Sequence, residues 1–186
     1  MSRFRIVDTA LQDLKVVIRE RRSDERGFLS RLFCAEELAA AGWRRGVAQI
    51  NHTLTRLPGS VRGMHFQRAP DLEAKLVSCL RGRVWDVAVD LRAGSPTLLR
   101  WHAEELSPDN GRALLIPEGF AHGFQVLDAG SELLYLHSMP YAPQSEAALN
   151  ALDPRLGIAW PLPVGDRSAR DQAHPLLTDE FQGIAA

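Results

Sequence analysis

Residues 75–91, with the sequence KLVSCLRGRVWDVAVDL, decide the fold class of this chain. The stretch divides at Gly82 into two short runs rich in valine and leucine, and in the second run, residues 84–91, valines mix with Trp85 and two aspartates. Short runs of β-branched and aromatic residues bounded by glycine are typical of strands, and alternating polarity is typical of a strand with one polar face. We therefore predict two strands joined by a turn, the second of which aims its polar groups at one face.

Short strands of the same kind continue in both directions along the chain. Turn sequences separate them, such as LPGS at 57–60, RAGSPT at 92–97 and LSPDNGR at 106–112. One short helix is predicted at 35–41, AEELAAA, because alanine, glutamate and leucine favour helices and Gly42 can end it. Many short strands at a spacing of about ten residues predict an all-β barrel or sandwich. The expected strands are 14–20, 28–33, 47–55, 61–66, 75–82, 84–91, 113–117, 120–128 and 132–139.

The charge balance restricts what the chain can bind. Its 186 residues contain 22 Lys and Arg against 23 Asp and Glu, which gives a formal net charge of −1. A balanced chain does not attract a nucleic acid or an acidic membrane through its overall charge, so we expect neither as a partner. An anionic ligand would have to be held by a few placed side chains.

Length and cysteine usage predict one domain in a reducing compartment. A domain holds about 150 residues on average, and this chain is only slightly longer. Cys34 and Cys79 are far apart and neither belongs to a C-x-x-C pair. Residues 1–20 lack the apolar stretch of a signal peptide, and the longest uncharged run, 133–145, is too short to span a bilayer. We therefore expect a cytoplasmic protein.

Several ionisable residues lie inside the expected strands. They are Arg62, His65, Lys75, Asp86 and His122. Barrel strands point alternate residues inward, so such groups can converge in the interior. Cupin-type metal sites usually contain a His-x-His pair, and none of the six histidines forms one, so we expect no metal. A metal held by histidines that are distant in sequence is the alternative.

Four blocks of sequence carry a resemblance, namely residues 61–97, 116–127, 132–143 and 153–161. Together they resemble the dTDP-4-dehydrorhamnose 3,5-epimerase family of nucleotide-sugar enzymes, over residues 14–175. The resemblance implies a cupin-type jelly-roll β-barrel with short peripheral helices, active as a homodimer that shares its N-terminal strands between subunits, without metal or cofactor. Within a single domain of residues 1–186, we expect an N-terminal arm at 1–44, a barrel core at 45–145 and a C-terminal segment at 146–186.

The implied reaction is epimerisation of a nucleotide-linked 4-keto-6-deoxyhexose, dTDP-4-dehydro-6-deoxyglucose or a related sugar. A proton leaves and returns through an enolate, which requires a base, a group that holds the enolate oxygen and an acid on the opposite face. By resemblance, His65 is the base and Asp171 fixes its tautomer. Tyr135 matches the acid, and Lys75 matches the cation that stabilises the enolate.

The resemblance also assigns the residues that hold the substrate. Arginine side chains suit a diphosphate because their planar forks match its oxygens. Tyr141 matches an aromatic residue that stacks near the nucleotide base, and Phe28 helps to form that slot. His122 lies in the pocket, where Asp86 orients it. The predicted substrate-binding residues are Arg26, Phe28, Gln49, Asn51, Arg62, His122 and Tyr141.

Two departures from the family pattern leave the nucleotide and the sugar open. Arg31 stands where many members carry glutamate, and the loop at 49–63 is longer than usual and precedes Met64 where leucine is common. Two alternatives therefore remain, a single-carbon 3- or 5-epimerase and a non-catalytic cupin that binds a sugar nucleotide. A base and an acid on opposite faces of the ligand argue against the second, because a binding protein needs neither.

Overall fold

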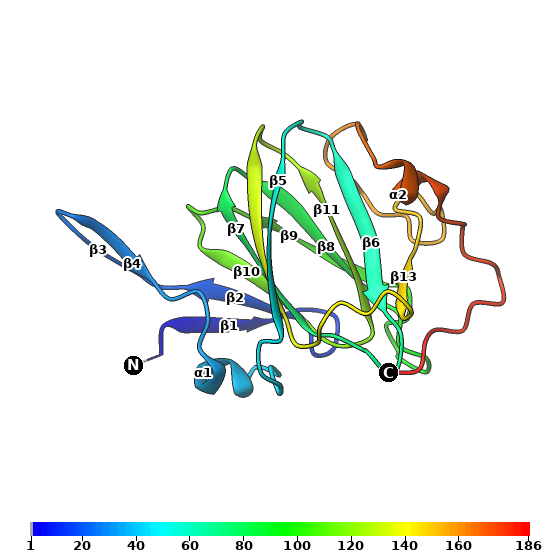
Figure 1. Ribbon diagram of the computed structural model, residues 1–186, viewed down its shortest axis with the longest axis horizontal. Helices are drawn as coiled ribbons and strands as arrows, with labels where there is room; N and C mark the ends of the chain where they lie inside the picture. Colours follow the sequence, from blue (N-terminus) through cyan, green and yellow to red (C-terminus); the bar gives the residue numbers. More distant parts are fainter. Residues whose placement is uncertain (1) are drawn as a thin grey trace.

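Two antiparallel β-sheets face each other in the computed structural model, which describes residues 2–186 (Figure 1). The six-stranded sheet has the order β1 (Phe4–Asp8), β2 (Lys15–Arg19), β10 (Arg112–Ile116), β7 (Lys75–Arg81), β12 (Ser131–His137) and β5 (Gln49–Thr55). The five-stranded sheet has the order β13 (Glu146–Ala148), β6 (Val61–Gln67), β11 (Phe120–Val126), β8 (Val84–Asp90) and β9 (Trp101–Leu106). The prediction of an all-β fold is confirmed.

The consecutive strands β7 and β8 belong to opposite sheets, so the chain crosses between the sheets at Gly82 and Arg83. Gly82 has a φ of 73°, and a Cβ atom there would clash with Ser131, so the crossing turn requires glycine. Neighbouring strands within each sheet are mostly distant in sequence, as in a jelly roll. The pairings among the described strands do not join the two sheets into a ring, so the structure is an open sandwich where a barrel was expected.

The apolar core has three parts, one between the sheets and one outside each sheet. Side chains of both sheets, including Val77 and Phe124, meet between them. The segment around α1 (Ala35–Ala39) covers the outer face of the six-stranded sheet, where Leu38 and Trp43 are buried. The C-terminal segment covers the outer face of the five-stranded sheet. Most strands of both sheets are therefore buried on two faces, whereas the outer face of β5 is exposed at Ile50 and Leu54.

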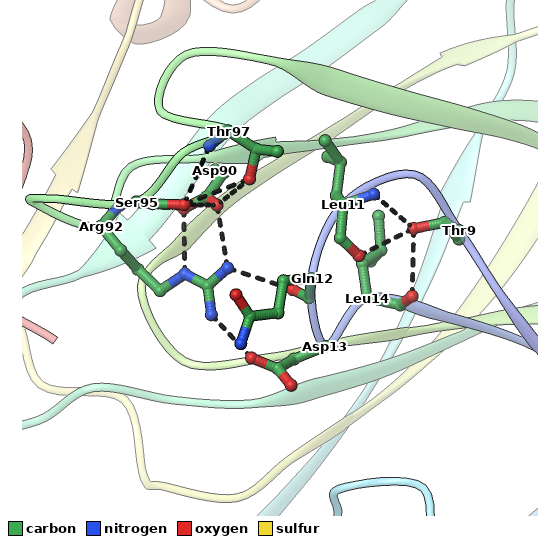
Figure 2. A network of polar contacts seen from close by, with 9 residues as sticks. All are labelled: Thr9, Leu11, Gln12, Asp13, Leu14, Asp90, Arg92, Ser95 and Thr97. Carbon is green, nitrogen blue, oxygen red and sulfur yellow. Dashed lines mark hydrogen bonds and ion pairs between the residues drawn. The ribbon is translucent and has the colours of Figure 1, made fainter.

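Strand β8 carries its polar groups on one face, as predicted, but that face is buried as well as the apolar one. Val87 and Val89 pack under the C-terminal segment, while Asp86 and Asp90 on the other face are fully buried. Figure 2 shows how one of these charges is accommodated, since Asp90 accepts hydrogen bonds from Arg92 and from two hydroxyl groups. Buried charges of this kind need such partners to be tolerated.

Several elements differ from the sequence pattern. The strands β1, β3 (Arg21–Asp24), β9 and β13 and the helix α2 (Ala169–Ala173) were not predicted, and the predicted helix at 35–41 ends at Ala39. The expected strand at 28–33 is the shorter β4 (Gly27–Ser30), which pairs with β3 as a hairpin. This β3–β4 hairpin projects away from the two sheets at the left of Figure 1. Across residues 2–186, no helix has the length and apolar character needed to cross a membrane.

Candidate active site

A cavity of about 300 Å³ opens between the two sheets. Strands β5, β7 and β12 line one side of it, and β6, β11 and β13 line the other. Among the predicted site residues, those in its wall are Gln49, Asn51, Arg62, His65, Lys75, His122, Tyr135 and Tyr141. Residues in its wall that the sequence reasoning missed include Thr53, Gln67, Glu73, His137 and Glu146. The fold therefore gathers residues that lie up to almost a hundred positions apart in the chain.

Strand register explains why these side chains meet. In the six-stranded sheet, Tyr135 lies opposite Asn51, and the next inward position, His137, lies opposite both Gln49 and Lys75. Residues directly opposite each other in antiparallel strands share a face of the sheet. The alternation of side chains in β5, β7 and β12 thus places polar residues of all three strands together at one end of the interior.

His65 and Asp171 form a hydrogen-bonded pair at the edge of the cavity. His65 Nε2 lies 2.7 Å from Asp171 Oδ1, and the side chains are 36% and 5% exposed. The Asp171 backbone N–H donates to Ser168 Oγ, which caps α2 and fixes the carboxylate. Burial alone would raise the pKa of Asp171, but the hydrogen bond and charge of His65 outweigh it and lower that pKa. An ionised carboxylate only accepts, so Nε2 carries the proton of a neutral His65 ring and Nδ1 keeps a free lone pair.

His174 completes a group of three metal-type ligands with this pair. Its Nε2 lies 4.0 Å from Asp171 Oδ1, and the ligand atoms of all three residues lie within 4.8 Å of one another. Burial lowers the pKa of His174, and the nearby His65 lowers it further. Ligands of a tetrahedral zinc ion stand about 3.3 Å apart, given zinc–nitrogen distances near 2.0 Å. A metal here would therefore have to break the 2.7 Å hydrogen bond that orients His65.

His122 forms a second imidazole–carboxylate pair. Its Nε2 lies 2.8 Å from Oδ1 of the fully buried Asp86, as the predicted orienting role requires. Burial raises the pKa of Asp86, although the charge and hydrogen bond of His122 oppose this. Close backbone approach also occurs beside His122, since a Cβ atom on Gly63 would lie 2.9 Å from the His122 carbonyl oxygen. The glycines of β6 and β11 thus let the two strands approach each other at the cavity wall.

Lys75 is held by a carboxylate that the sequence reasoning did not single out. Its Nζ lies 3.0 Å from Glu73 Oε1 and donates to the His65 backbone oxygen at 3.3 Å. The other carboxylate oxygen, Oε2, lies 2.7 Å from Nδ1 of His137. Burial would raise the pKa of Glu73, but the charges and hydrogen bonds of Lys75 and His137 lower it instead. The lysine is thus paired with Glu73, not with Asp86.

Tyr135 lies between two histidines at the floor of the cavity. Its ring centroid is 5.8 Å from that of His122 and 6.1 Å from that of His137. Burial is the largest cause of a strongly raised pKa for Tyr135, which keeps the phenol protonated at neutral pH. A protonated phenol in the wall of a cavity that also contains an imidazole base meets the chemical requirement for an acid.

The outer end of the cavity is polar and more exposed. Gln49 Nε2 donates to Asn51 Oδ1 at 3.1 Å, and Gln49 Oε1 accepts from the Tyr141 backbone N–H at 3.0 Å. The Tyr141 hydroxyl lies 2.6 Å from Glu146, and this hydrogen bond raises the pKa of the phenol. Arg62 lines the same cavity. These groups can hold a polar or anionic portion of a ligand.

Two predicted residues lie away from this cavity. Arg26 and Phe28 are on the β3–β4 hairpin, where Arg26 pairs with Asp24 and Phe28 lies beneath the Arg21 guanidinium. Within one chain they therefore contribute nothing to the cavity wall formed by the described residues.

Two of the residues that the sequence reasoning missed carry a detectable signal. Glu73 and His137 each lie two positions from a predicted catalytic residue, Lys75 and Tyr135 respectively. Residues two positions apart in a strand point to the same face. Applied to the strand containing Tyr135, this rule predicts that His137 also faces the cavity.

Comparison with known proteins agrees with this architecture. The family model for dTDP-4-dehydrorhamnose 3,5-epimerase matches residues 8–179. The dTDP-4-dehydrorhamnose 3,5-epimerase of Salmonella typhimurium is 40% identical, covering 92% of this chain and 94% of the relative. The dTDP-4-dehydrorhamnose 3-epimerase of Streptomyces niveus is also 40% identical, covering 86% of this chain and 77% of the relative.

A solved structure is similar throughout. The dTDP-6-deoxy-D-glucose-3,5-epimerase of Legionella pneumophila, in complex with dTDP-4-keto-L-rhamnose, has a TM-score of 0.89 and 38% sequence identity, covering 98% of both chains. This similarity confirms the predicted cupin-type fold. The family model and these relatives span nearly the whole chain at substantial identity. This chain belongs to the dTDP-4-dehydrorhamnose 3,5-epimerase family.

Proposed function

We propose that this protein epimerises dTDP-4-dehydro-6-deoxyglucose or a closely related nucleotide-linked 4-keto-6-deoxyhexose. One observation carries the proposal: His65, oriented by the ionised Asp171, shares a single cavity with the protonated phenol of Tyr135. An isomerase that inverts a carbon next to a ketone needs such a base and such an acid. The alternative of a ligand-binding protein without turnover gives no reason for this combination.

The proposed mechanism moves one proton off the carbon and another onto it. The free Nδ1 lone pair of His65 takes the proton next to the C4 ketone, and the electrons of the broken C–H bond form a C=C bond and an enolate oxygen. Lys75, held by Glu73, offers a positive charge to that oxygen. Tyr135 then gives its proton to the opposite face of the carbon, and exchange with solvent restores both residues.

We propose that the nucleotide occupies the outer end of the cavity. Arg62 would meet the diphosphate, Gln49 and Asn51 would bind polar groups beside it, and Tyr141 would stack near the base. The exposed β3–β4 hairpin would bring Arg26 and Phe28 to the cavity of a partner subunit in a homodimer, since neither reaches the cavity of its own chain.

The cytoplasmic location also remains a prediction, which cell fractionation can test.

The main open choice is whether the protein inverts two carbons or one. One observation keeps both the double and the single epimerase as candidates. Two relatives with the same 40% identity carry the names 3,5-epimerase and 3-epimerase. Incubation of the protein with dTDP-4-dehydro-6-deoxyglucose in heavy water, followed by NMR, distinguishes them. Deuterium at C3 and C5 with an inverted product supports the double epimerase, and deuterium at C3 or C5 alone supports a single epimerase. No deuterium uptake would contradict the proposed substrate.

We also propose that this proton transfer needs no bound metal. In the group His65, Asp171 and His174, the atoms that a metal would use already make the hydrogen bond that orients the base. We expect full deuterium exchange after dialysis against EDTA. Loss of exchange on chelation, with recovery on addition of Zn²⁺ or Fe²⁺, would contradict this expectation.

A further inference from the structure

A continuous series of hydrogen bonds runs along the wall of the cavity, and its inner half is buried. Lys75 Nζ lies 3.0 Å from Glu73 Oε1, and Glu73 Oε2 lies 2.7 Å from His137 Nδ1. The three side chains are 8%, 9% and 12% exposed, respectively. Ionised groups at this depth stay in place because each has its partner within hydrogen-bond distance.

The outer half of the series continues from the other nitrogen of the same imidazole. His137 Nε2 lies 3.3 Å from Asn51 Nδ2, and Asn51 Oδ1 accepts from Gln49 Nε2 at 3.1 Å. Gln49 Oε1 in turn accepts from the Tyr141 backbone N–H at 3.0 Å. The series thus joins the lysine proposed to stabilise the enolate to the residues proposed to hold the nucleotide.

When the His137 ring is neutral, the donors and acceptors of the series are consistent with only one direction. Glu73 is ionised and accepts from both of its partners, so His137 donates through Nδ1–H. His137 Nε2 is then an acceptor, and it faces the N–H₂ group of Asn51. Asn51 therefore turns its oxygen to Gln49, which leaves the Gln49 oxygen for the Tyr141 N–H. Every donor in the series points toward Glu73.

We propose that Glu73 and His137 are positioning residues, which fix the amide orientations of Asn51 and Gln49 for the nucleotide and the position of Lys75 for the sugar. This inference rests on the proposed function of the same cavity. An amide side chain at an exposed strand edge can present either its oxygen or its N–H₂ group to a ligand. Anchoring it to a buried imidazole removes this freedom before the ligand arrives, which strengthens binding.

Affinity for dTDP, measured by calorimetry without turnover, tests the outer half of the series. His137→Phe keeps an aromatic ring but removes the acceptor for Asn51, and Gln49→Ala removes the last amide. We expect each variant to weaken dTDP binding by about tenfold, the effect of a well-made hydrogen bond to a ligand. Because both act through one series, the double variant should weaken binding by much less than the product of the two single effects.

His52→Gln is the matched control for these variants. His52 lies on β5 between Asn51 and Thr53, faces away from the cavity and contacts Glu132 at 2.9 Å. We expect its affinity for dTDP to equal that of the wild type. Unchanged affinity for dTDP in His137→Phe would overturn the proposal. So would a double variant whose loss of dTDP affinity equals the product of the two single losses.

Glu73→Gln tests the inner half, because an amide has one oxygen and cannot accept at both of the positions where the two carboxylate oxygens meet Lys75 and His137. We expect kcat, measured well below the melting temperature of the variant, to fall by about tenfold or more, since the lysine loses its fixed partner. Glu73→Gln with wild-type kcat and wild-type dTDP affinity would overturn the positioning role.

These measurements separate the two proposals. Wild-type protein that binds dTDP but shows no epimerisation contradicts the proposed function alone. If the wild-type protein is active but the effects of His137→Phe and Gln49→Ala on dTDP affinity multiply in the double variant, only the positioning role is contradicted. Wild-type protein that does not bind dTDP contradicts both.

Discussion

The proposed chemistry of the cavity depends most directly on the hydrogen bond between His65 and Asp171. His65→Asn should abolish deuterium exchange into the substrate, because it removes the base but keeps a polar side chain of similar reach. Asp171→Asn should lower kcat by about a hundredfold or more, since an amide can hold the imidazole in the wrong tautomer. Initial rates at saturating substrate measure both effects. An Asp171→Asn variant with more than half of the wild-type kcat would contradict the proposed pair.

The ionisation of Tyr135 tests whether its phenol is buried. The chain has two tyrosines, so Tyr141→Phe leaves Tyr135 as the only phenol. Burial raises the pKa of Tyr135 in the folded protein, whereas the unfolded chain ionises near pH 10. The associated stability is therefore complete below about pH 10 and is lost as the pH rises above it. We expect almost no phenolate absorbance from folded Tyr141→Phe at pH 10.5 and about three-quarters ionisation in urea at the same pH. Reversible ionisation of the folded variant near pH 10 would show that Tyr135 is not buried.

Single residues in the site differ in how far sequence can predict them. His65 and Lys75 lie in strongly patterned strands, so their inward direction follows from alternation. Asp171 lies in a polar segment without strand periodicity, and only its resemblance to the family assigned it a role. Pairings across strands, such as that of Glu73 with His137, depend on register. Register is fixed by the whole sheet, so composition and local pattern do not reveal these pairs.

Local sequence pattern is also limited in predicting whole strands and helices. The strands that it missed are all edge strands. The strands β1, β9 and β13 each lie at the edge of a sheet, and β3 belongs to the two-stranded hairpin, in which both strands are edges. Edge strands are partly exposed and carry charged residues, so their apolar pattern is weaker than that of central strands. In the central strand β8, alternation correctly places the aspartates on one face but does not reveal that this face is buried. The segments that cover a sheet are remote in sequence from its strands. Local periodicity therefore predicts the central strands better than it predicts which segments pack against them.

The polar network at the end of β8 holds distant elements together and makes a testable contribution to stability. Asp90 accepts from Arg92 at 2.9 Å, and Arg92 also reaches Asp13 in the loop between β1 and β2 (Figure 2). Burial would raise the pKa of Asp90, but hydrogen bonds from Arg92 and neighbouring hydroxyl groups lower it. Asp90→Asn should lower the free energy of unfolding by about 3 kcal/mol, because it removes the fully buried one of the two carboxylates that pair with the partly buried Arg92.

The pH dependence of this effect has a definite sign. An aspartate with a lowered folded pKa stabilises the protein above its ordinary pKa near 3.8, and this contribution disappears as the pH falls through the folded value. The difference between wild type and Asp90→Asn in urea unfolding should therefore be largest at pH 7 and shrink below about pH 4. Asp128→Asn, in an exposed pair with Arg83, is the control and should cost less than about 1 kcal/mol. A larger deficit at pH 3.5 than at pH 7 would contradict the assignment.

At the scale of the whole molecule, the β3–β4 hairpin supports the proposed homodimer and makes it testable. Phe28 and Leu29 are 61% and 69% exposed on an element that contributes little to its own core. Exposed apolar side chains on a projecting hairpin are typical of an interface. We expect light scattering to give the mass of a dimer and Phe28→Ser with Leu29→Ser to shift it toward the monomer. A wild-type monomer at micromolar concentration would contradict the shared-strand homodimer.

A mixed dimer tests whether the hairpin completes the cavity of its partner. Arg26→Ala damages the hairpin and leaves the cavity intact, whereas His65→Asn inactivates the cavity and leaves the hairpin intact. In a mixed dimer of the two, purified through different tags, the intact hairpin meets the intact cavity only if it reaches across the interface. We then expect about half of the wild-type activity at low substrate concentration, since one of two sites is complete. If the hairpin serves its own chain, the mixed dimer stays as weak as Arg26→Ala, because each chain carries one defect that its partner cannot repair.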